Sequence, residues 1–228
     1  MTLCTYLKTR DGCAVLGADS FAGDDYHFRQ SEKIHRYGHV YLMEAGDESH
    51  IESIKRRIRR RLTEAGSVDN LLVYLESWNK KYKKRAFLKD AFFILSFSEG
   101  GDGIYYCPEE DDIRKIESYQ TIGIGKESAD IVLNLFYRAN SWRKNPPSTA
   151  DAVKATLYSF YASIGRDTAV KPPVKIIVTS KEPKEFLIDE TTKTWRKVVK
   201  EARGRFTFRN NGNGLNVLEL LEGSAGQL

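Results

Sequence analysis

Short strand-like runs alternate with pairs of helix-like segments along the chain, and this order most restricts the folds open to it. The strand-like runs are apolar or alternate between apolar and polar residues, as β-strands do. They occupy residues 3–8, 13–18, 33–37, 40–43, 91–97, 104–107, 121–125 and 174–178. The first two are joined by a turn containing Asp11-Gly12, a pair that hairpins favour.

Helical periodicity separates these runs in two places. Ile51, Ile54, Ile58 and Leu62 repeat at three- and four-residue intervals, which places them on one face of a helix. Helices are predicted for residues 48–64, 67–85, 127–142 and 148–164, with a further candidate at 189–202. Helices that come in consecutive pairs suit antiparallel sheets better than alternating βαβ units. The sequence therefore predicts an α+β fold, a four-layer αββα sandwich of two antiparallel sheets flanked by helix pairs.

The length of 228 residues is enough for one domain with a full core. We expect a single domain over residues 1–228, with a C-terminal extension from about residue 185 that is mobile after residue 210, where Asn and Gly accumulate. No apolar run has the length of a membrane span, and residues 1–20 do not resemble a signal peptide. These features predict a cytoplasmic protein without a membrane partner.

Cysteine and histidine do not indicate a disulfide or a metal site. The three cysteines, Cys4, Cys13 and Cys107, are odd in number and form no CxxC pair, which is typical of a chain in a reducing compartment. The four histidines lack the spacing of an HExxH zinc site. We therefore expect neither a metal nor an organic cofactor.

The net charge of +5 admits an acidic partner without requiring one. The most basic stretch, residues 55–61, lies between the apolar positions of a predicted helix, so its first interpretation is a solvated helix face. Contact with another subunit or with nucleic acid is the second interpretation. Nucleic acid is not among the partners that we expect.

A set of small motifs recurs at the ends of the predicted strands. Thr2 follows the initiator methionine, Asp19 ends the second strand in Ala18-Asp19-Ser20, and Lys33 lies at the start of the third strand. Gly46 follows the fourth strand in an Ala-Gly pair. In this order and spacing the motifs resemble a β-type subunit of the proteasome superfamily, within the N-terminal nucleophile (Ntn) hydrolases. The resemblance covers roughly residues 2–180. Within that superfamily, the chain is especially similar to the bacterial two-component peptidase.

The resemblance implies a threonine peptidase. The Thr2 hydroxyl would be the nucleophile after removal of Met1, and its own α-amino group, with an ordinary pKa of about 7.7–8.0, would take the proton. Lys33 would lower neighbouring proton affinities, with Asp19 as its partner. The Gly46 N–H would bind the oxyanion.

Two positions near the end of the family pattern differ from it. The family carries Gly-Ser-Gly where this chain has Gly123-Ile124-Gly125, and a serine where it has Val170. Asp167, which the family shares, is retained as a further site residue. Because the two serines assist the terminal amine in the family, a catalytically silent, ring-forming homologue stays open as an alternative. Thr168 is a candidate replacement for one hydroxyl.

Glu44 lies just before the Ala-Gly pair, where the family places the floor of its main specificity pocket. A carboxylate there predicts a preference for Lys or Arg before the cleaved bond. The resemblance further implies a polypeptide substrate, self-association into rings and a separate ATPase unfoldase. An Ntn amidohydrolase or transpeptidase that acts on another amide is the remaining alternative.

Overall fold

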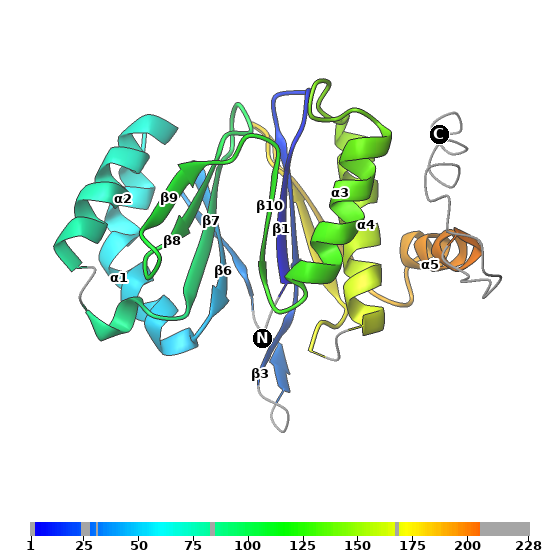
Figure 1. Cartoon of the computed structure of the whole chain (residues 1–228), viewed down its shortest axis with the longest axis horizontal. Helices are drawn as coiled ribbons and strands as arrows, with labels where there is room; N and C mark the ends of the chain where they lie inside the picture. Colours follow the sequence, from blue (N-terminus) through cyan, green and yellow to red (C-terminus); the bar gives the residue numbers. More distant parts are fainter. Residues whose placement is uncertain (1–2, 24–27, 31, 83–84, 167–168, 206–228) are drawn as a thin grey trace.

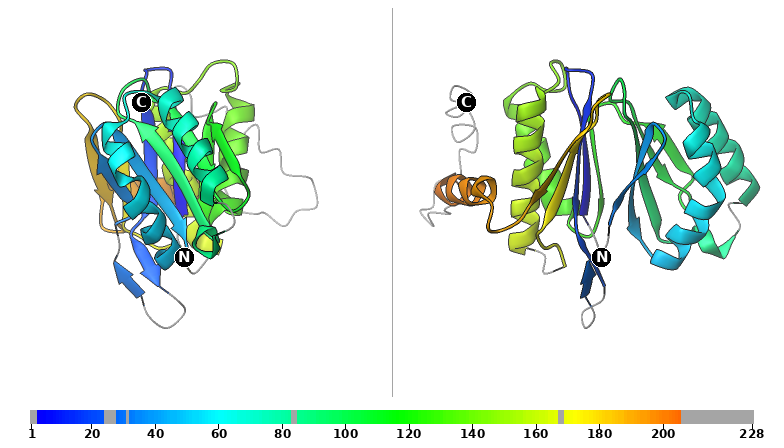
Figure 2. Two further views of the ribbon diagram at one scale, coloured as in Figure 1. Left: turned by 90° about the vertical axis from the view of Figure 1, so that its left-hand side faces the viewer. Right: turned by 180° about the vertical axis from the view of Figure 1, so that it is seen from behind.

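The computed structural model describes residues 3–23, 28–30, 32–82, 85–166 and 169–205. Within them, two five-stranded sheets lie face to face, and helices cover the outer face of each (Figures 1 and 2). Every pairing within the two sheets is antiparallel. The predicted α+β four-layer sandwich is therefore confirmed.

The first sheet contains Asp19, at the end of β2. Its strand order is β10-β1-β2-β11-β12, and α3 and α4 cover its outer face. The elements are β1 (Leu3–Lys8), β2 (Ala14–Asp19), β10 (Tyr119–Gly123), β11 (Val174–Val178), β12 (Lys184–Ile188), α3 (Lys126–Ala139) and α4 (Thr149–Arg166). Cys4 pairs with Ala18, so the start of β1 lies beside the end of β2.

The second sheet has the order β5-β6-β7-β8-β9 and is covered by α1 and α2. Its elements are β5 (Ile34–Tyr37), β6 (Val40–Gly46), β7 (Ala91–Phe97), β8 (Gly103–Cys107), β9 (Asp112–Lys115), α1 (Glu48–Glu64), α2 (Val68–Tyr82) and the short 3-10 helix η1 (Ala86–Leu88). A separate two-stranded sheet pairs β3 (Phe21–Gly23) with β4 (Phe28–Gln30).

Side chains alternate across β6, and this alternation positions part of the candidate site. Tyr41, Met43 and Ala45 lie in the apolar cluster between the two sheets. Val40 and Leu42 lie in the cluster under α1 and α2. Because successive strand residues point to opposite faces, Glu44 points toward α1 and not between the sheets.

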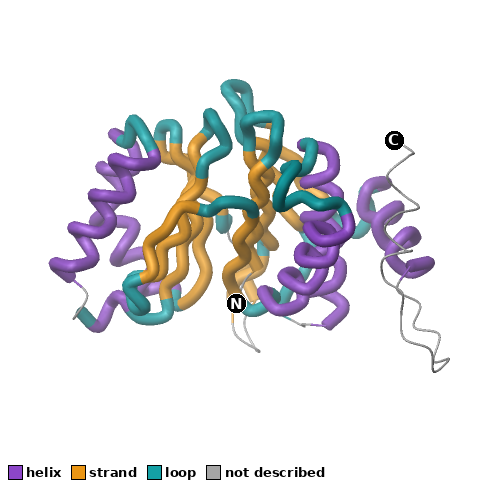
Figure 3. The backbone as a smooth tube through the Cα atoms, turned by 45° about the horizontal axis from the view of Figure 1, so that its top comes forward, coloured by secondary structure: helices purple, strands orange, loops and turns teal. Residues whose placement is uncertain are grey.

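A further helix extends the helical layer beyond α4. Helix α5 (Lys193–Arg205) lies on the outer side of α4, as Figures 1 and 3 show. Trp195 and Val198 are buried in the same cluster as the inner face of α4, and the rings of Trp195 and Tyr161 lie 6.2 Å apart. The region set apart as an extension thus begins with a paired strand, β12, and continues into a packed helix.

None of the helices in the described residues is both long and apolar enough to cross a membrane.

Candidate active site

Asp19 holds the start of β1 against the end of β2. Its side chain is 1% exposed, and its Oδ1 accepts a hydrogen bond from the Leu3 backbone N–H at 2.8 Å. Its other carboxylate oxygen, Oδ2, is buried without a hydrogen-bond partner among the described residues. A buried carboxylate with a free oxygen is therefore fixed next to the residue that follows Thr2 in the sequence.

Burial raises the pKa of Asp19 to about 7, although the Leu3 N–H and the charge of Lys33 both oppose the shift. Taking a carboxylate out of water disfavours its charged form, and two favourable partners do not fully compensate for this loss. A carboxyl group that titrates near neutral pH can hold or release a proton during catalysis.

Replacing Asp19 with asparagine should change how stability depends on pH. Because the pKa is higher in the folded state, the contribution of Asp19 is complete below about pH 4 and is lost as the pH rises through about 7. Asp19→Asn removes this loss, so the unfolding free energy of the variant relative to the parent should increase from pH 4 to pH 8. Denaturant unfolding across this range measures the difference, with the exposed Glu76→Gln as the control. A difference that does not change with pH would contradict the assignment.

Lys33 is half-buried just before β5. Its positive charge lowers the pKa of Asp19 on β2 and of Cys4 on β1. Burial nevertheless raises the Cys4 pKa well above its ordinary value, and Cys4 Sγ lies 3.5 Å from the Glu44 carbonyl oxygen. Cys4 therefore stays a neutral thiol beneath the candidate site and acts as packing, as its apolar position in β1 indicates.

Gly46 is at the end of β6, in a conformation that only glycine adopts readily. Its φ is +123°, and a Cβ added to it would lie 1.8 Å from the Asp90 carbonyl oxygen. Asp47 follows and caps α1, because its side chain accepts a hydrogen bond from the His50 N–H at 3.0 Å. The positive end of the α1 dipole therefore begins directly after Gly46, which is the electrostatic setting that an oxyanion site requires.

Glu44 is 7% exposed and is engaged within the chain. Its Oε2 lies 3.0 Å from Lys55 Nζ, and its Oε1 lies 3.2 Å from His35 Nε2. Burial would raise the Glu44 pKa, but the hydrogen bond from His35 and the charge of Lys55 hold it below its ordinary value. Lys55 also pairs with Glu52 at 2.6 Å. The Glu44 charge is thus largely balanced before any substrate binds.

Lys55 and His35 are the contacts that the sequence analysis missed. Lys55 lies on the buried side of α1, four residues after Ile51, and is itself 7% exposed. A charged residue at an apolar position of a helix needs a buried partner, and this was the signal available in the sequence.

Removing Lys55 should cost more stability than removing an exposed helix cation. Lys55→Met leaves the buried Glu44 carboxylate with His35 alone, and we expect the unfolding free energy to fall by about 2 kcal/mol. Arg60→Met, which removes an exposed ion pair with Glu64, should leave the unfolding free energy almost unchanged. The double variant Glu44→Gln/Lys55→Met should recover most of the loss in denaturant unfolding. A double variant less stable than Lys55→Met would show that the pair is not coupled in this way.

Thr2 and Asp167 lie outside the described residues, as does Thr168.

The two positions that differ from the family pattern, Ile124 and Val170, lie within the described residues. Val170 is buried and its methyl group would lie 2.8 Å from a Cβ added to Gly125, whereas Ile124 is 47% exposed. Ser163 donates to the carbonyl oxygens of Gly125 and Ser159 at 3.0 and 2.9 Å. The Ser163 hydroxyl beside Gly125 is therefore already hydrogen-bonded to backbone carbonyl oxygens, and Val170 has no hydroxyl group.

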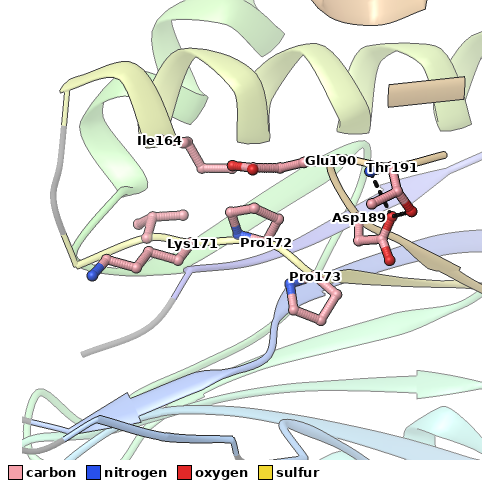
Figure 4. A pocket seen from close by; sticks show the side chains of 8 residues that line it. Ile164, Lys171, Pro172, Pro173, Asp189, Glu190 and Thr191 are labelled. Atoms are coloured by element: carbon pink, nitrogen blue, oxygen red, sulfur yellow. Dashed lines mark hydrogen bonds between the residues drawn. The ribbon is translucent and has the colours of Figure 1, made fainter. Parts of the chain in front are cut away.

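A cavity of about 610 Å³ lies next to the segment that leads from α4 to β11. Figure 4 shows Lys171, Pro172 and Pro173 on this segment, facing residues 189–191, which precede α5. The Asp189 carboxylate already has partners within the chain, since its Oδ1 accepts hydrogen bonds from the Thr191 N–H and hydroxyl. Pro173 also ties this region to the site, because its carbonyl oxygen accepts a hydrogen bond from the Ser20 N–H at 3.1 Å, next to Asp19.

In the part of the chain that the structure describes, no group of three or more His, Cys, Asp or Glu residues is placed to hold a metal ion. The three cysteines are buried and unpaired.

The chain matches no family model, and a search of curated proteins finds no relative. Solved structures match it at low identity. Anbu (ancestral beta-subunit) from Yersinia bercovieri has a TM-score of 0.73 and 15% identity, over 93% of this chain and 98% of that chain. An Anbu (Gly-1) mutant from Hyphomicrobium sp. strain MC1 has a TM-score of 0.69 and 14% identity, over 94% and 100%. The chain thus has a fold similar to that of these ancestral β-subunit proteins, in keeping with the expected proteasome-like architecture.

Proposed function

We propose that the chain is a peptidase of the N-terminal nucleophile type, with Thr2 as the nucleophile once Met1 is removed. The observation that carries the proposal is the hydrogen bond from the Leu3 N–H to the buried Asp19 carboxylate. It ties the residue after Thr2 to a carboxyl group whose pKa burial raises to about 7, within reach of the charge of Lys33.

The proposed reaction proceeds by acyl transfer. The Thr2 hydroxyl attacks the peptide carbonyl while the Thr2 amine takes its proton, and the oxyanion that forms accepts a hydrogen bond from the Gly46 N–H. The amine returns the proton to the leaving amine, and water then hydrolyses the ester on Thr2. Lys33 stabilises negative charge, while Asp19 and Asp167 orient the cation and the amine.

A catalytically silent homologue is the second candidate, and one observation favours it. Val170 packs against Gly125 where the family resemblance places a serine, and Ser163 is bound to backbone oxygens. With no hydroxyl group on Val170 and the Ser163 hydroxyl bound to backbone oxygens, proton transfer to and from the Thr2 amine would be slower. An Ntn enzyme that acts on another amide would share the same nucleophile.

Glu44 remains our proposal for the floor of the specificity pocket, with Lys or Arg preferred before the cleaved bond. Because Lys55 balances Glu44, we expect a weak preference in the parent protein and a stronger one in Lys55→Met. Fluorogenic peptides with Arg, Glu or Leu at that position measure it. A preference for the acidic peptide in Lys55→Met would remove Glu44 from the pocket.

For assembly and location we propose rings of this chain in the cytoplasm, supplied with polypeptide substrate by an ATPase. Analytical ultracentrifugation of the purified chain tests the ring. A monomer at micromolar concentration would contradict it.

Covalent trapping tests the nucleophile directly. Intact mass first shows whether the native protein lacks Met1. The protein is then treated with a β-lactone that acylates N-terminal threonine, and peptide mapping should place the adduct on Thr2. Retained Met1 with no adduct would favour the silent homologue, and an adduct elsewhere would assign another nucleophile.

A further inference from the structure

A second cavity, of about 430 Å³, lies at the open side of the sandwich, where the β5 edge of one sheet meets the β11 and β12 edge of the other. Residues of β5, β6, β11, β12 and α1 line it. None of the described candidate residues Asp19, Lys33, Glu44 and Gly46 is among them. The cavity is therefore separate from Asp19, Lys33 and Gly46, although His35, which lines it, contacts Glu44 at 3.2 Å.

The charges in this cavity leave an excess of positive charge. Lys175 pairs with Glu32 at 2.7 Å and with Glu185 at 3.2 Å, so the two carboxylates share one cation. Arg36 and Arg59 also line the cavity, and neither forms an ion pair with a described residue. Two guanidinium groups outweigh the one uncompensated carboxylate, which favours an anionic occupant.

The base of the cavity carries a polar group without a partner. Tyr41 is 1% exposed, and its hydroxyl is buried with no hydrogen-bond partner among the described residues. Leaving a buried hydroxyl unpaired is costly, so such groups normally have an acceptor. The Arg36 guanidinium lies 5.5 Å from the centre of the Tyr41 ring, and Arg36 pairs with Tyr41 across β5 and β6.

The guanidinium of Arg36 keeps most of its donors available. Its Nε donates to the Gly38 carbonyl oxygen at 3.2 Å, which fixes the direction of the side chain. The two terminal nitrogens form no hydrogen bond with a described residue, and planar guanidinium donors match the oxygens of a phosphate or carboxylate. The Tyr37 ring, which is partly exposed, would contact an organic body attached to such a group, while Ile34 and Ile177 are buried behind the cavity surface.

We propose that this cavity binds a small organic anion, whose phosphate or carboxylate group is held by Arg36 and the Tyr41 hydroxyl. The cavity is larger than an inorganic oxyanion needs, and its aromatic wall suits a ring. Phosphate and carboxylate share the recognition chemistry, and the choice of probes separates them.

Isothermal titration calorimetry of the full chain with four probes tests the proposal. Phenyl phosphate and benzoate differ in the anionic group, while inorganic phosphate and acetate lack the ring. We expect saturable binding of at least one aromatic anion, with weaker binding of its counterpart without the ring. Whichever aromatic probe binds more tightly identifies the anionic group.

Three variants locate the binding. Arg36→Gln should abolish saturable binding, and Tyr41→Phe should weaken it about tenfold while leaving thermal stability unchanged or higher, because the lost hydroxyl had no partner. Arg143→Gln removes the same charge from an exposed position after α3 and should bind as the parent does. No saturable binding of any probe, unchanged affinity in Arg36→Gln or Tyr41→Phe, or an equal loss in Arg143→Gln would overturn the proposal.

Discussion

A Thr2→Ala variant should lose peptidase activity by roughly 10³-fold or more in kcat/KM, since no acyl-enzyme forms without the hydroxyl group. Thr2→Ser should keep measurable activity, because a primary hydroxyl beside the same amine can still attack. Hydrolysis of the best fluorogenic peptide measures both variants. The variants should be compared only after intact mass has shown that Met1 is removed from each.

Thr5→Val, in β1, provides a control three residues after Thr2 in the sequence. Thr5 is fully buried and its hydroxyl has no hydrogen-bond partner among the described residues, so a valine of similar shape should preserve both stability and activity. If Thr2→Ala and Thr5→Val both retained the parent rate, Thr2 would not be the nucleophile. If both lost it, the loss in Thr2→Ala could not be assigned to one reacting oxygen.

A Gly46→Ala variant should be the most destabilised single substitution that we predict, losing about 4 kcal/mol or more of unfolding free energy. The added methyl carbon would lie 1.8 Å from the Asp90 carbonyl oxygen, and the φ of +123° is unfavourable for any residue with a Cβ. Relief requires β6 and the Asp90–Ala91 backbone to separate. Denaturant unfolding with linear extrapolation measures the loss.

Gly66→Ala is the matched control for this substitution. An added Cβ at Gly66 would meet no heavy atom within 4 Å, so its effect should stay within about 0.5 kcal/mol of the parent. Should Gly46→Ala prove as stable as Gly66→Ala, the close approach of Gly46 to Asp90 would be wrong, and the oxyanion assignment that depends on this backbone geometry would fail with it.

The long elements of the fold were predictable from the sequence because their patterns are strong. The prediction of a helix at residues 48–64 matches α1, whose apolar positions repeat without interruption and whose start is capped by Asp47. The prediction of a strand at 91–97 matches β7, which is apolar at every position except Ser96. Both signals are local, so one sequence is enough to read them.

Short and exposed strands escaped prediction. Strand β9 at Asp112–Lys115 and strand β12 at Lys184–Ile188 are mostly exposed, and their sequences contain charged residues. Each is an edge strand that is held by backbone pairing with one neighbour, and this pairing leaves no apolar pattern in the sequence. The pair β3–β4 was also missed, because strands of three residues are too short to show a periodic pattern.

The sequence predicted where the candidate site residues lie along the strands, but not which side chains they contact. Asp19 and Gly46 occupy strand ends that the motif order indicated. The alternation of β6 was equally readable, yet the interaction of Glu44 with Lys55 depends on how α1 packs over the sheet. Contacts between elements far apart in the sequence are set by packing, which a single sequence does not display.

The packing of α5 over α4 has a consequence for how copies of this chain can approach one another. Trp195 and Val198 fill the outer side of α4 with side chains of the same chain. A neighbour arriving from that direction would meet α5 first, at a distance increased by one helix diameter of about 10 Å. Close side-by-side contacts between copies are therefore more accessible through the α1–α2 side and the strand edges. Removal of α5 would expose the apolar surface of α4 that Trp195 and Val198 cover.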